Sequence, residues 1–343
     1  MENLRCVRFD DIHAALDALR PYDDAFMNLS IGTLHDYLRS KSSEGSVGSE
    51  PGHFFGLYRG EDLVLALTHA PGEFAWQLSC PQSAEHLMTP DFLATATDVL
   101  ARTLLPLTSP SAVTHVWGHE AAVLAYLNTW AALVGGDGVS RRIGDAFIPG
   151  TRASYATRET IPPPPNSPSN IVITQAVEAD FEELFPLYFE FRSQTGRTHA
   201  LHVEQETLRK GISAGVAWIC RIDGSIVAFI VLGRVTPRTI AIRNVYVIPE
   251  RRRKGIAESL VKAMTRYYLG VSPLGYQVTA GDHPAEGPKD TVCIIVADPA
   301  AERIYRRAGF LFPEKTEDGA TAGGRDPVSG LKTWYPVTLR GFE

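Results

Sequence analysis

Cysteine is scarce in this chain of 343 residues, and its four cysteines lie far apart in the sequence. No Cys-x-x-Cys spacing joins any two of them, so the sequence predicts neither a zinc site nor a disulfide framework. Cys220 and Cys293 fall inside apolar runs, where a cysteine most simply serves as a small core residue. We therefore expect a protein of a reducing compartment, with a cytoplasmic location and no bound metal.

The sequence also lacks long hydrophobic segments and an excess of positive charge. No stretch approaches the roughly 18 uninterrupted apolar residues of a membrane helix, and Met1 to Arg8 lack the apolar centre of a signal peptide. Lysine and arginine number 33 against 39 acidic residues, and the net charge of −6 argues against a nucleic-acid partner held by bulk electrostatics. We expect a soluble protein that binds neither membrane nor nucleic acid.

A strand, a turn and a helix are predicted between Thr239 and Tyr268. An alternating apolar run stops at Pro249, and a helical pattern takes over at Gly255. The four cations Arg251 to Lys254 precede the helix, where free amides and a positive dipole end meet two small residues, Gly255 and Ala257. This combination predicts an anion site suited to a diphosphate. Four cations alone would indicate a solvated surface, but the small residues at fixed offsets favour a binding site.

A second strand and helix are predicted downstream. Val292 to Ala297 is an apolar run of buried-strand length, and Asp298-Pro299 forms a helix cap followed by a first-turn proline. The helix carries Tyr305 on an apolar stripe and ends at Gly309-Phe310. A tyrosine on such a stripe is more often a core residue. Its position one motif after the predicted diphosphate site favours a catalytic role instead.

Together the two motifs resemble those of the GNAT superfamily of acyl-CoA-dependent N-acyltransferases. Arg252 to Ala257 reads Arg-x-x-Gly-x-Ala, which resembles the diphosphate loop Gln/Arg-x-x-Gly-x-Gly/Ala of that family. Asp298 to Phe310 reads Asp-x-x-Ala-x-x-x-Tyr-x-x-x-Gly-Phe and resembles its second signature, in which asparagine is usual at the first position. Other phosphate loops fit poorly, because the chain has no Gly-Lys-Ser/Thr ending and no Gly-x-Gly-x-x-Gly there.

The resemblance implies acetyl-CoA as co-substrate and roles for named residues. The amide of Val245 would bond the acyl carbonyl, and the backbone near Val247 would bond the pantetheine arm. Tyr305 would protonate the leaving thiolate, since a phenol of pKa about 10 can donate to a thiolate of pKa about 8.5 when held in contact. Val245 and Tyr305 are thus the implied catalytic residues. The implied cofactor-binding residues are Val245, Tyr246, Val247, Arg252, Arg253, Lys254, Gly255, Ile256, Ala257, Asp298, Ala301 and Tyr305.

The general base is not identified by any motif. An alkylamine of pKa about 10.4 must lose a proton at a cost of roughly 4 to 5 kcal/mol at neutral pH. Some family members place a strand glutamate eleven residues before the motif arginine, where this chain has Ala241. Glu190, His199, His202 and His283 are candidates by neighbourhood, and a water relay would need none of them.

A proline-rich segment, 161–169, predicts a semi-rigid spacer without core contacts between two domains, 1–160 and 170–343. Both halves predict the order strand, two helices, three strands, helix, strand, helix. We expect an α/β (α+β) fold of two GNAT-like domains, each a mixed, mostly antiparallel sheet flanked by helices. The closing strand of the second domain is expected at 331–339. Two long segments, 272–290 and 313–330, are expected to be lids or disordered.

The first half echoes the second signature as His119-x-x-Ala122-x-x-x-Tyr126. Its segment Cys80 to Pro90 has no glycine, two prolines and no lysine or arginine where the second half has its cationic loop. We expect a degenerate first domain, retained for packing or for shaping the acceptor pocket, and a catalytic second domain.

The predicted function is transfer of an acetyl group from acetyl-CoA directly to a primary amine of a small molecule. Two alternatives stay open: acetylation of a peptide or protein amine, and a non-catalytic acyl-CoA-binding module. Retention of both motifs argues against the binding module.

Overall fold

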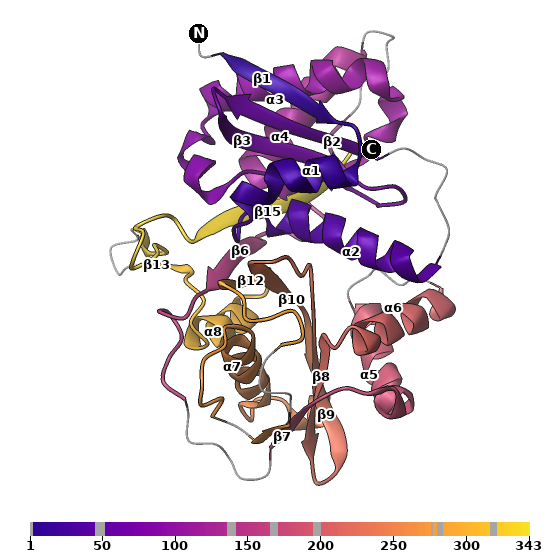
Figure 1. Cartoon of the computed structure of the whole chain (residues 1–343), viewed down its shortest axis with the longest axis vertical. Helices are drawn as coiled ribbons and strands as arrows, with labels where there is room; N and C mark the ends of the chain where they lie inside the picture. The colour runs from indigo at the N-terminus through magenta and orange to yellow at the C-terminus, as the bar shows by residue number, and fades with distance from the viewer. Residues whose placement is uncertain are drawn as a thin grey trace. The chain divides into compact units, whose positions relative to one another are not determined.

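The computed structural model forms two compact units, each described by itself below (Figure 1). Unit 1 contains residues 1–154, 295–298 and 313–343, and unit 2 contains 155–294 and 299–312. The structure describes residues 3–44, 52–135, 142–164, 171–194, 200–275, 277–279, 284–315 and 321–343.

Unit 1 is built on a mixed sheet with the strand order β1-β2-β3-β4-β5-β15-β6. Neighbouring strands are antiparallel except β4 and β5, which are parallel. Its elements are β1 (Leu4–Phe9), α1 (Ile12–Leu19), α2 (Asn28–Glu44), β2 (His53–Arg59), β3 (Asp62–His69), β4 (Trp76–Ser79), α3 (Pro90–Leu104), β5 (His115–His119), α4 (Glu120–Val134), β6 (Arg152–Ala156), β13 (Pro313–Lys315), β14 (Thr321–Gly323) and β15 (Trp334–Gly341).

Helices cover both faces of the unit 1 sheet. Leu34 of α2 packs with Phe54 of β2 on one face, and Trp130 of α4 packs with the neighbouring Phe55 on the other, because successive strand residues point to opposite faces. Local signals start the helices: the Asp11 carboxylate accepts the amides of His13 and Ala14 at the beginning of α1.

Unit 2 has the strand order β12-β10-β9-β8-β7-β11. β7 to β10 pair antiparallel in sequence order, and β10 pairs parallel with β12. Figure 1 shows α7 and α8 on one face of this sheet and α5 and α6 on the other. The elements are β7 (Val172–Gln175), α5 (Phe181–Gln194), α6 (Leu201–Ser213), β8 (Ala217–Ile222), β9 (Ser225–Gly233), β10 (Thr239–Val247), α7 (Ile256–Tyr268), β11 (Gln277–Thr279), β12 (Thr291–Val296) and α8 (Pro299–Arg307).

The two units repeat one order of elements. Strand, two helices, three strands, helix, strand and helix occur as β1 to α4 and again from β7 to α8, with β11 added before β12. Three antiparallel pairings followed by one parallel pairing recur in the same positions. The expected fold class, mixed and mostly antiparallel sheets flanked by helices, is therefore confirmed.

The last strand differs from its expected place. The segment 331–339 was expected to close the sheet of the second half, but β15 pairs antiparallel with β5 over Val337 to Gly341 and with β6 over Trp334 to Pro336. The units therefore differ from the predicted ranges 1–160 and 170–343 in where the C-terminal strand lies. The division of roles between those ranges stays a prediction.

The beginning of the proline-rich segment is packed and not a bare spacer. Nη1 of Arg266 on α7 donates to the Pro162 carbonyl at 2.9 Å, and the backbone of Ile161 lies against Gly309. The expectation of no core contacts is thus wrong for this part, because a buried guanidinium needs carbonyl acceptors. Residues 165–170 lie outside the described part of the chain.

The other long segments contain some secondary structure. In 272–290, β11 pairs parallel with β7, and residues 276 and 280–283 are outside the description. In 313–330, β13 and β14 form an antiparallel pair, and residues 316–320 are outside it. A lid role for either segment stays a prediction. Within the described helices, none has the length and apolar character needed to cross a membrane.

We expect Gly309→Ala to destabilise unit 2 by about 3 kcal/mol. Gly309 has φ +99°, and a Cβ there would lie 2.8 Å from the Thr160 carbonyl oxygen and 2.9 Å from Ile161 Cα, so backbone strain and a steric clash add. Gly224→Ala is the control, because Gly224 also has a positive φ but a Cβ there would meet no atom within 4 Å. Urea unfolding should show the larger loss for Gly309→Ala, and equal losses would contradict the close approach.

Candidate active site

β10 changes partners in the middle of its length. Its parallel pairing with β12 runs from Thr239 opposite Thr291 to Ile242 opposite Ile294, whereas its antiparallel pairing with β9 continues to Val247. The register with β9 shifts between Ile242 and Asn244, so Arg243 is an inserted bulge residue. The bulge and the end of the β12 pairing coincide, and they give β10 an edge inside the unit.

The backbone of Val245 faces this edge. The Ile248 amide donates to the Val227 carbonyl of β9 at 3.0 Å, and the Val247 carbonyl accepts instead from Nε of Arg252 at 2.9 Å. Because backbone groups alternate in direction along a strand, the amide of Val245 points away from β9, as the Val247 carbonyl does. The Val245 amide therefore points to the side of β10 that β9 does not occupy, and its role as donor to an acyl carbonyl stays a prediction.

The predicted diphosphate loop begins α7. A short 3-10 turn, Pro249–Arg251, follows β10, and α7 starts at Ile256. Arg253 and Gly255 have φ +62° and +77°, and Gly255 caps α7 without a side-chain hydrogen bond. The first amides of a helix have no intrahelical acceptors and carry the positive end of its dipole, so this turn has the donors that a diphosphate needs.

The cations of the loop divide into two groups. The side chain of Arg252 lies against β10. Its Nε donates to the Val247 carbonyl, and its guanidinium carbon lies 5.4 Å from the ring centre of Tyr246. The side chains of Arg253 and Lys254 are exposed and available to an anion at the helix start. Arg252 therefore holds the loop against β10, and a contact of Arg252 with cofactor stays a prediction.

Glu258 in the first turn of α7 joins this helix to α8. Its carboxylate accepts from Nζ of Lys262 and from Nε of Arg307, each at 2.7 Å. Burial raises the pKa of Glu258, but the hydrogen bonds from these two cations outweigh it and hold the pKa below its usual value. The negative charge at this end of α7 is thus balanced locally.

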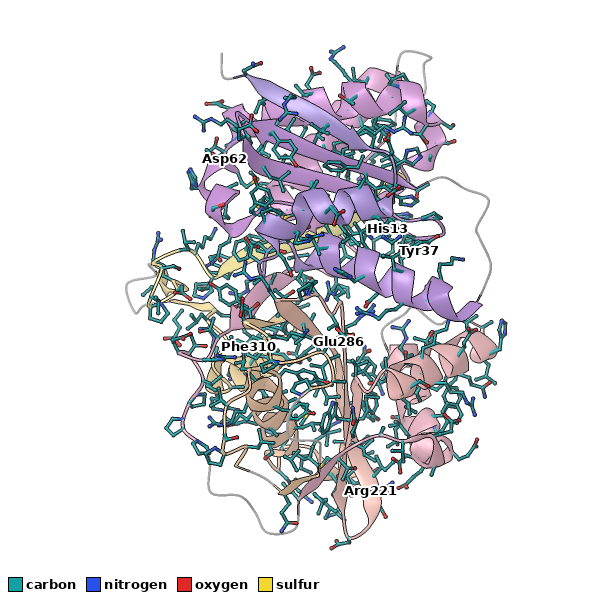
Figure 2. All side chains as sticks on the ribbon, in the orientation of Figure 1. His13, Tyr37, Asp62, Arg221, Glu286 and Phe310 are labelled. Atoms are coloured by element: carbon teal, nitrogen blue, oxygen red, sulfur yellow. The ribbon has the colours of Figure 1, made fainter. Side chains whose placement is uncertain are left out.

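Tyr305 lies on α8, which packs against α7. It is 7% exposed, and its ring meets that of Phe310, labelled in Figure 2, edge-on at 5.6 Å between centroids. Ala301 is half-buried and Asp298 is exposed. The structure brings the loop, α7 and Tyr305 to one face of the unit 2 sheet. The side chains of Val245 and Val247 point to the same face, because the side chain of Tyr246 between them packs with α5 on the opposite face.

Of the four base candidates, two belong to the described residues. Glu190 is an exposed residue of α5 close to the Tyr246 hydroxyl, and burial first and then the hydrogen-bond interaction with Glu190 raise the pKa of Tyr246. His202 is exposed on α6. His199 and His283 lie outside the description.

Sequence reasoning missed a charged cluster on the α5–α6 face. Nε of Arg192 lies 3.2 and 3.1 Å from the two carboxylate oxygens of Glu204, which is 1% exposed. Burial raises the pKa of the adjacent Tyr188 to about 12, with opposing effects of Arg192 and Glu204. The sequence does contain a signal for the burial of Glu204. This residue precedes Leu208 and Ile212 at four-residue spacing and so occupies a core position of α6.

Unit 1 has different chemistry at the corresponding places. The amide of Gln82, just after β4, donates to the Asp24 carboxylate at 2.8 Å, so an acid occupies the region where unit 2 has a cationic loop. Burial raises the pKa of Asp24 to about 6. Tyr126, the counterpart of Tyr305, is fully buried, and its hydroxyl has no hydrogen-bond partner among the described residues. Across the described residues of both units, no group of three potential ligands could hold a metal.

Comparison with known proteins points to one family. Residues 179–285 match the family described as Acetyltransferase (GNAT) family. Among solved structures, a GNAT acetyltransferase from Colwellia psychrerythraea is 12% identical, with 99% of this chain and 100% of that chain covered and a TM-score of 0.47. A GCN5-related N-acetyltransferase from Sphaerobacter thermophilus is 14% identical, with 98% and 95% covered and a TM-score of 0.48.

A tandem GNAT protein from the clavulanic acid biosynthesis pathway is 12% identical, with 99% of this chain and 98% of that chain covered and a TM-score of 0.47. The comparison with curated proteins found no match. The family match covers α5, β10 and α7 of the candidate site, and α8 with Tyr305 lies beyond the matched residues. Residues 179–285 are therefore a domain of the acetyltransferase (GNAT) family, in a chain whose two units repeat one order of elements.

Proposed function

We propose that this protein is an acyl-CoA-dependent N-acyltransferase that moves an acetyl group from acetyl-CoA to a primary amine of a small molecule. One observation carries the proposal: the edge of β10 that exposes the Val245 amide runs directly into a helix start able to bind a diphosphate. When bound, acetyl-CoA would supply an activated thioester carbonyl. Arg253, Lys254 and the first amides of α7 would hold its phosphates.

The residues of unit 2 would perform direct transfer in defined roles. The Val245 amide would polarise the acyl carbonyl, and one such oriented donor contributes about 3 kcal/mol of transition-state stabilisation. As the amine nitrogen bonds to the carbonyl carbon, the carbon–sulfur bond breaks and Tyr305 would give its hydroxyl proton to the sulfur. The amine proton would pass to Glu190 or to water. Holding the two reactants together supplies the larger share of the barrier reduction.

The first unit would take no cofactor of its own. Asp24 places a carboxylate on the amide that follows β4, which opposes a second anion there. We propose that unit 1 is retained for its fold and that the reaction belongs to unit 2. We also propose a cytoplasmic location, which is consistent with four free cysteines.

We expect Tyr305→Phe to lower kcat about 100-fold while the KM for acetyl-CoA stays within about twofold, because the ring and its packing remain and only the proton donor is lost. Thiol release from acetyl-CoA with an amine panel measures both constants. Tyr126→Phe is the matched control in unit 1 and should keep full activity. A wild-type protein that binds CoA but releases no thiol with any amine would indicate the binding module instead.

We expect Ala257→Glu to raise the KM for acetyl-CoA at least about tenfold, because the new carboxylate would face the diphosphate at the start of α7. A glutamate in the first helical turn favours the helix itself, so the variant should fold. Ala14→Glu places the same residue in the first turn of α1 and is the control. Calorimetric titration with CoA measures the affinity. An unchanged affinity in Ala257→Glu would contradict binding of the diphosphate by this loop.

A further inference from the structure

The beginning of the proline-rich segment forms a strap on unit 2, which consists of residues 157–163. It starts with a turn in which Oγ1 of Thr160 accepts the Thr157 amide at 2.9 Å and the Thr160 amide donates to the Thr157 carbonyl at 3.2 Å. Pro162 and Pro163 follow, and prolines have no N–H to donate. The backbone of these two prolines can therefore be held by hydrogen bonds only as an acceptor.

Two arginines attach the strap to the C-terminal end of α7. Arg158 of the strap donates from Nε to the Leu269 carbonyl at 2.7 Å, which suits the last carbonyls of a helix because they have no intrahelical donors. Arg266 of α7 donates from Nη1 to the Pro162 carbonyl at 2.9 Å and from Nε to the Pro273 carbonyl at 2.7 Å. Arg266 is 5% exposed, so the loss of either acceptor would cost the desolvation of a buried guanidinium group.

The strap also holds the turn that ends α8. Residues of the strap, of α7 and of this turn line one recess: Ile161, Pro162, Pro163, Lys262, Arg266 and Ala308. The approach is close at Gly309, where an added Cβ would lie 2.9 Å from Ile161 Cα. The strap therefore contacts α7 and the end of α8 at the same time.

The turn after α8 sets the position of Tyr305. The Tyr305 carbonyl accepts the amides of Ala308 at 2.9 Å and of Phe310 at 3.1 Å, and the Tyr305 ring meets the Phe310 ring edge-on. A shift of this turn would therefore move Tyr305 through both its backbone and its ring, because a packed interior transmits displacement.

A second link between the two helices is more exposed. Nε of Arg307 on α8 lies 2.7 Å from the Glu258 carboxylate of α7, and the Arg307 side chain is 54% exposed. Ion pairs of this exposure contribute little, because water and salt screen them. The pair also shows that the end of α8 lies beside the start of α7, where the predicted diphosphate loop is. The buried contacts of the strap are thus the stronger of these two restraints on the turn after α8.

We propose that the strap positions Tyr305 for proton transfer, with Arg266 as its main anchor. The inference rests on the proposed function, in which the hydroxyl proton of Tyr305 goes to the sulfur as the carbon–sulfur bond breaks. Arg266 and the strap are positioning groups that act through Tyr305. A displacement of about 1 Å of such a donor costs up to about 100-fold in rate, so a contact far from the chemistry can control it.

A double-mutant cycle tests the coupling between Arg266 and Tyr305. Arg266→Met should lower kcat about tenfold while the KM for acetyl-CoA stays within about twofold, because the diphosphate loop lies at the other end of α7. In the Tyr305→Phe background the hydroxyl is absent, and the same substitution should lower kcat less than about twofold. Arg266→Lys keeps a donor and should recover part of the loss. An equal loss of kcat in both backgrounds would mean that Arg266 supports the fold alone, and it would overturn the inference.

Two further variants separate the strap from a general loosening of α7. Arg158→Met removes an exposed side chain, so it should fold, and it should lower kcat in the same direction by about threefold. Lys289→Met is the matched control. Lys289 is also a buried cation that donates to a carbonyl, from Nζ to Thr236 at 2.9 Å, and its amide bonds the Tyr268 carbonyl of α7. This control should keep kcat within about twofold, and a loss as large as that of Arg266→Met would contradict the proposed role of the strap.

Amide hydrogen exchange reports on the turn without any turnover. In Arg266→Met the amides of Ala308 and Phe310 should exchange at least about tenfold faster than in the wild type, and in Lys289→Met they should not change. Unchanged exchange in Arg266→Met overturns the inference whether or not the protein is active. No thiol release by the wild type with any amine would instead overturn the proposed function and the catalytic part of this inference, while faster exchange would still support the attachment of the strap to this turn.

Discussion

Unit 2 depends on one change of pairing along β10. Up to Ile242 the strand has the ladders of β9 and β12 on its two sides, and beyond the bulge at Arg243 the β9 ladder continues without the other. Backbone groups that lose a ladder inside a fold must find another partner or serve a ligand. Arg252 provides one such partner for the Val247 carbonyl. The roles proposed for Val245, for the loop before α7 and for Tyr305 all require this edge.

The two units show that the fold alone does not make the site. Both have a parallel strand pair after three antiparallel pairings. In unit 1 the pair is tight, since a Cβ at Gly118 of β5 would overlap the Leu78 carbonyl oxygen of β4, and the Asp24 carboxylate accepts the Gln82 amide after β4. In unit 2, β10 continues beyond its parallel pairing with β12 and leads into the Gly255 turn and the start of α7. The same topology therefore supports packing in one unit and offers anion donors in the other.

Local chemistry explains which parts of this structure could be predicted from the sequence. The turn Asp223-Gly224 requires positive φ at both residues, and they have φ 52° and 84°; Asp11 caps a helix as its type predicts. The positions of α7 and α8 follow from periodicity and caps. These features depend on residues a few positions apart, so a linear pattern contains them.

Long-range pairings and buried charges could not be predicted in this way. β15 pairs with β5, which lies more than 200 residues earlier in the chain, and no local pattern names that partner. The hydrogen bond from Arg252 to the Val247 carbonyl of the preceding strand had no signal in the sequence, and its expected contact with cofactor stays a prediction. Glu204 shows the same limit of prediction on the α5–α6 face. Its position on the apolar stripe of α6 can be recognised in the sequence, but its pairing with Arg192 on α5 depends on how the two helices pack.

Carboxylates on both faces of the unit 2 sheet are balanced by neighbouring cations. An unbalanced Glu258 would weaken the positive end of α7, and Lys262 with Arg307 prevents this; Arg192 does the same for Glu204 on the opposite face. Among the described residues, cations without such a local carboxylate partner then lie at the α7 start, where Arg253 and Lys254 are exposed. In the proposed reaction this end of the helix keeps its positive potential for the phosphates of the donor, because the nearby carboxylate is already neutralised by its own cations.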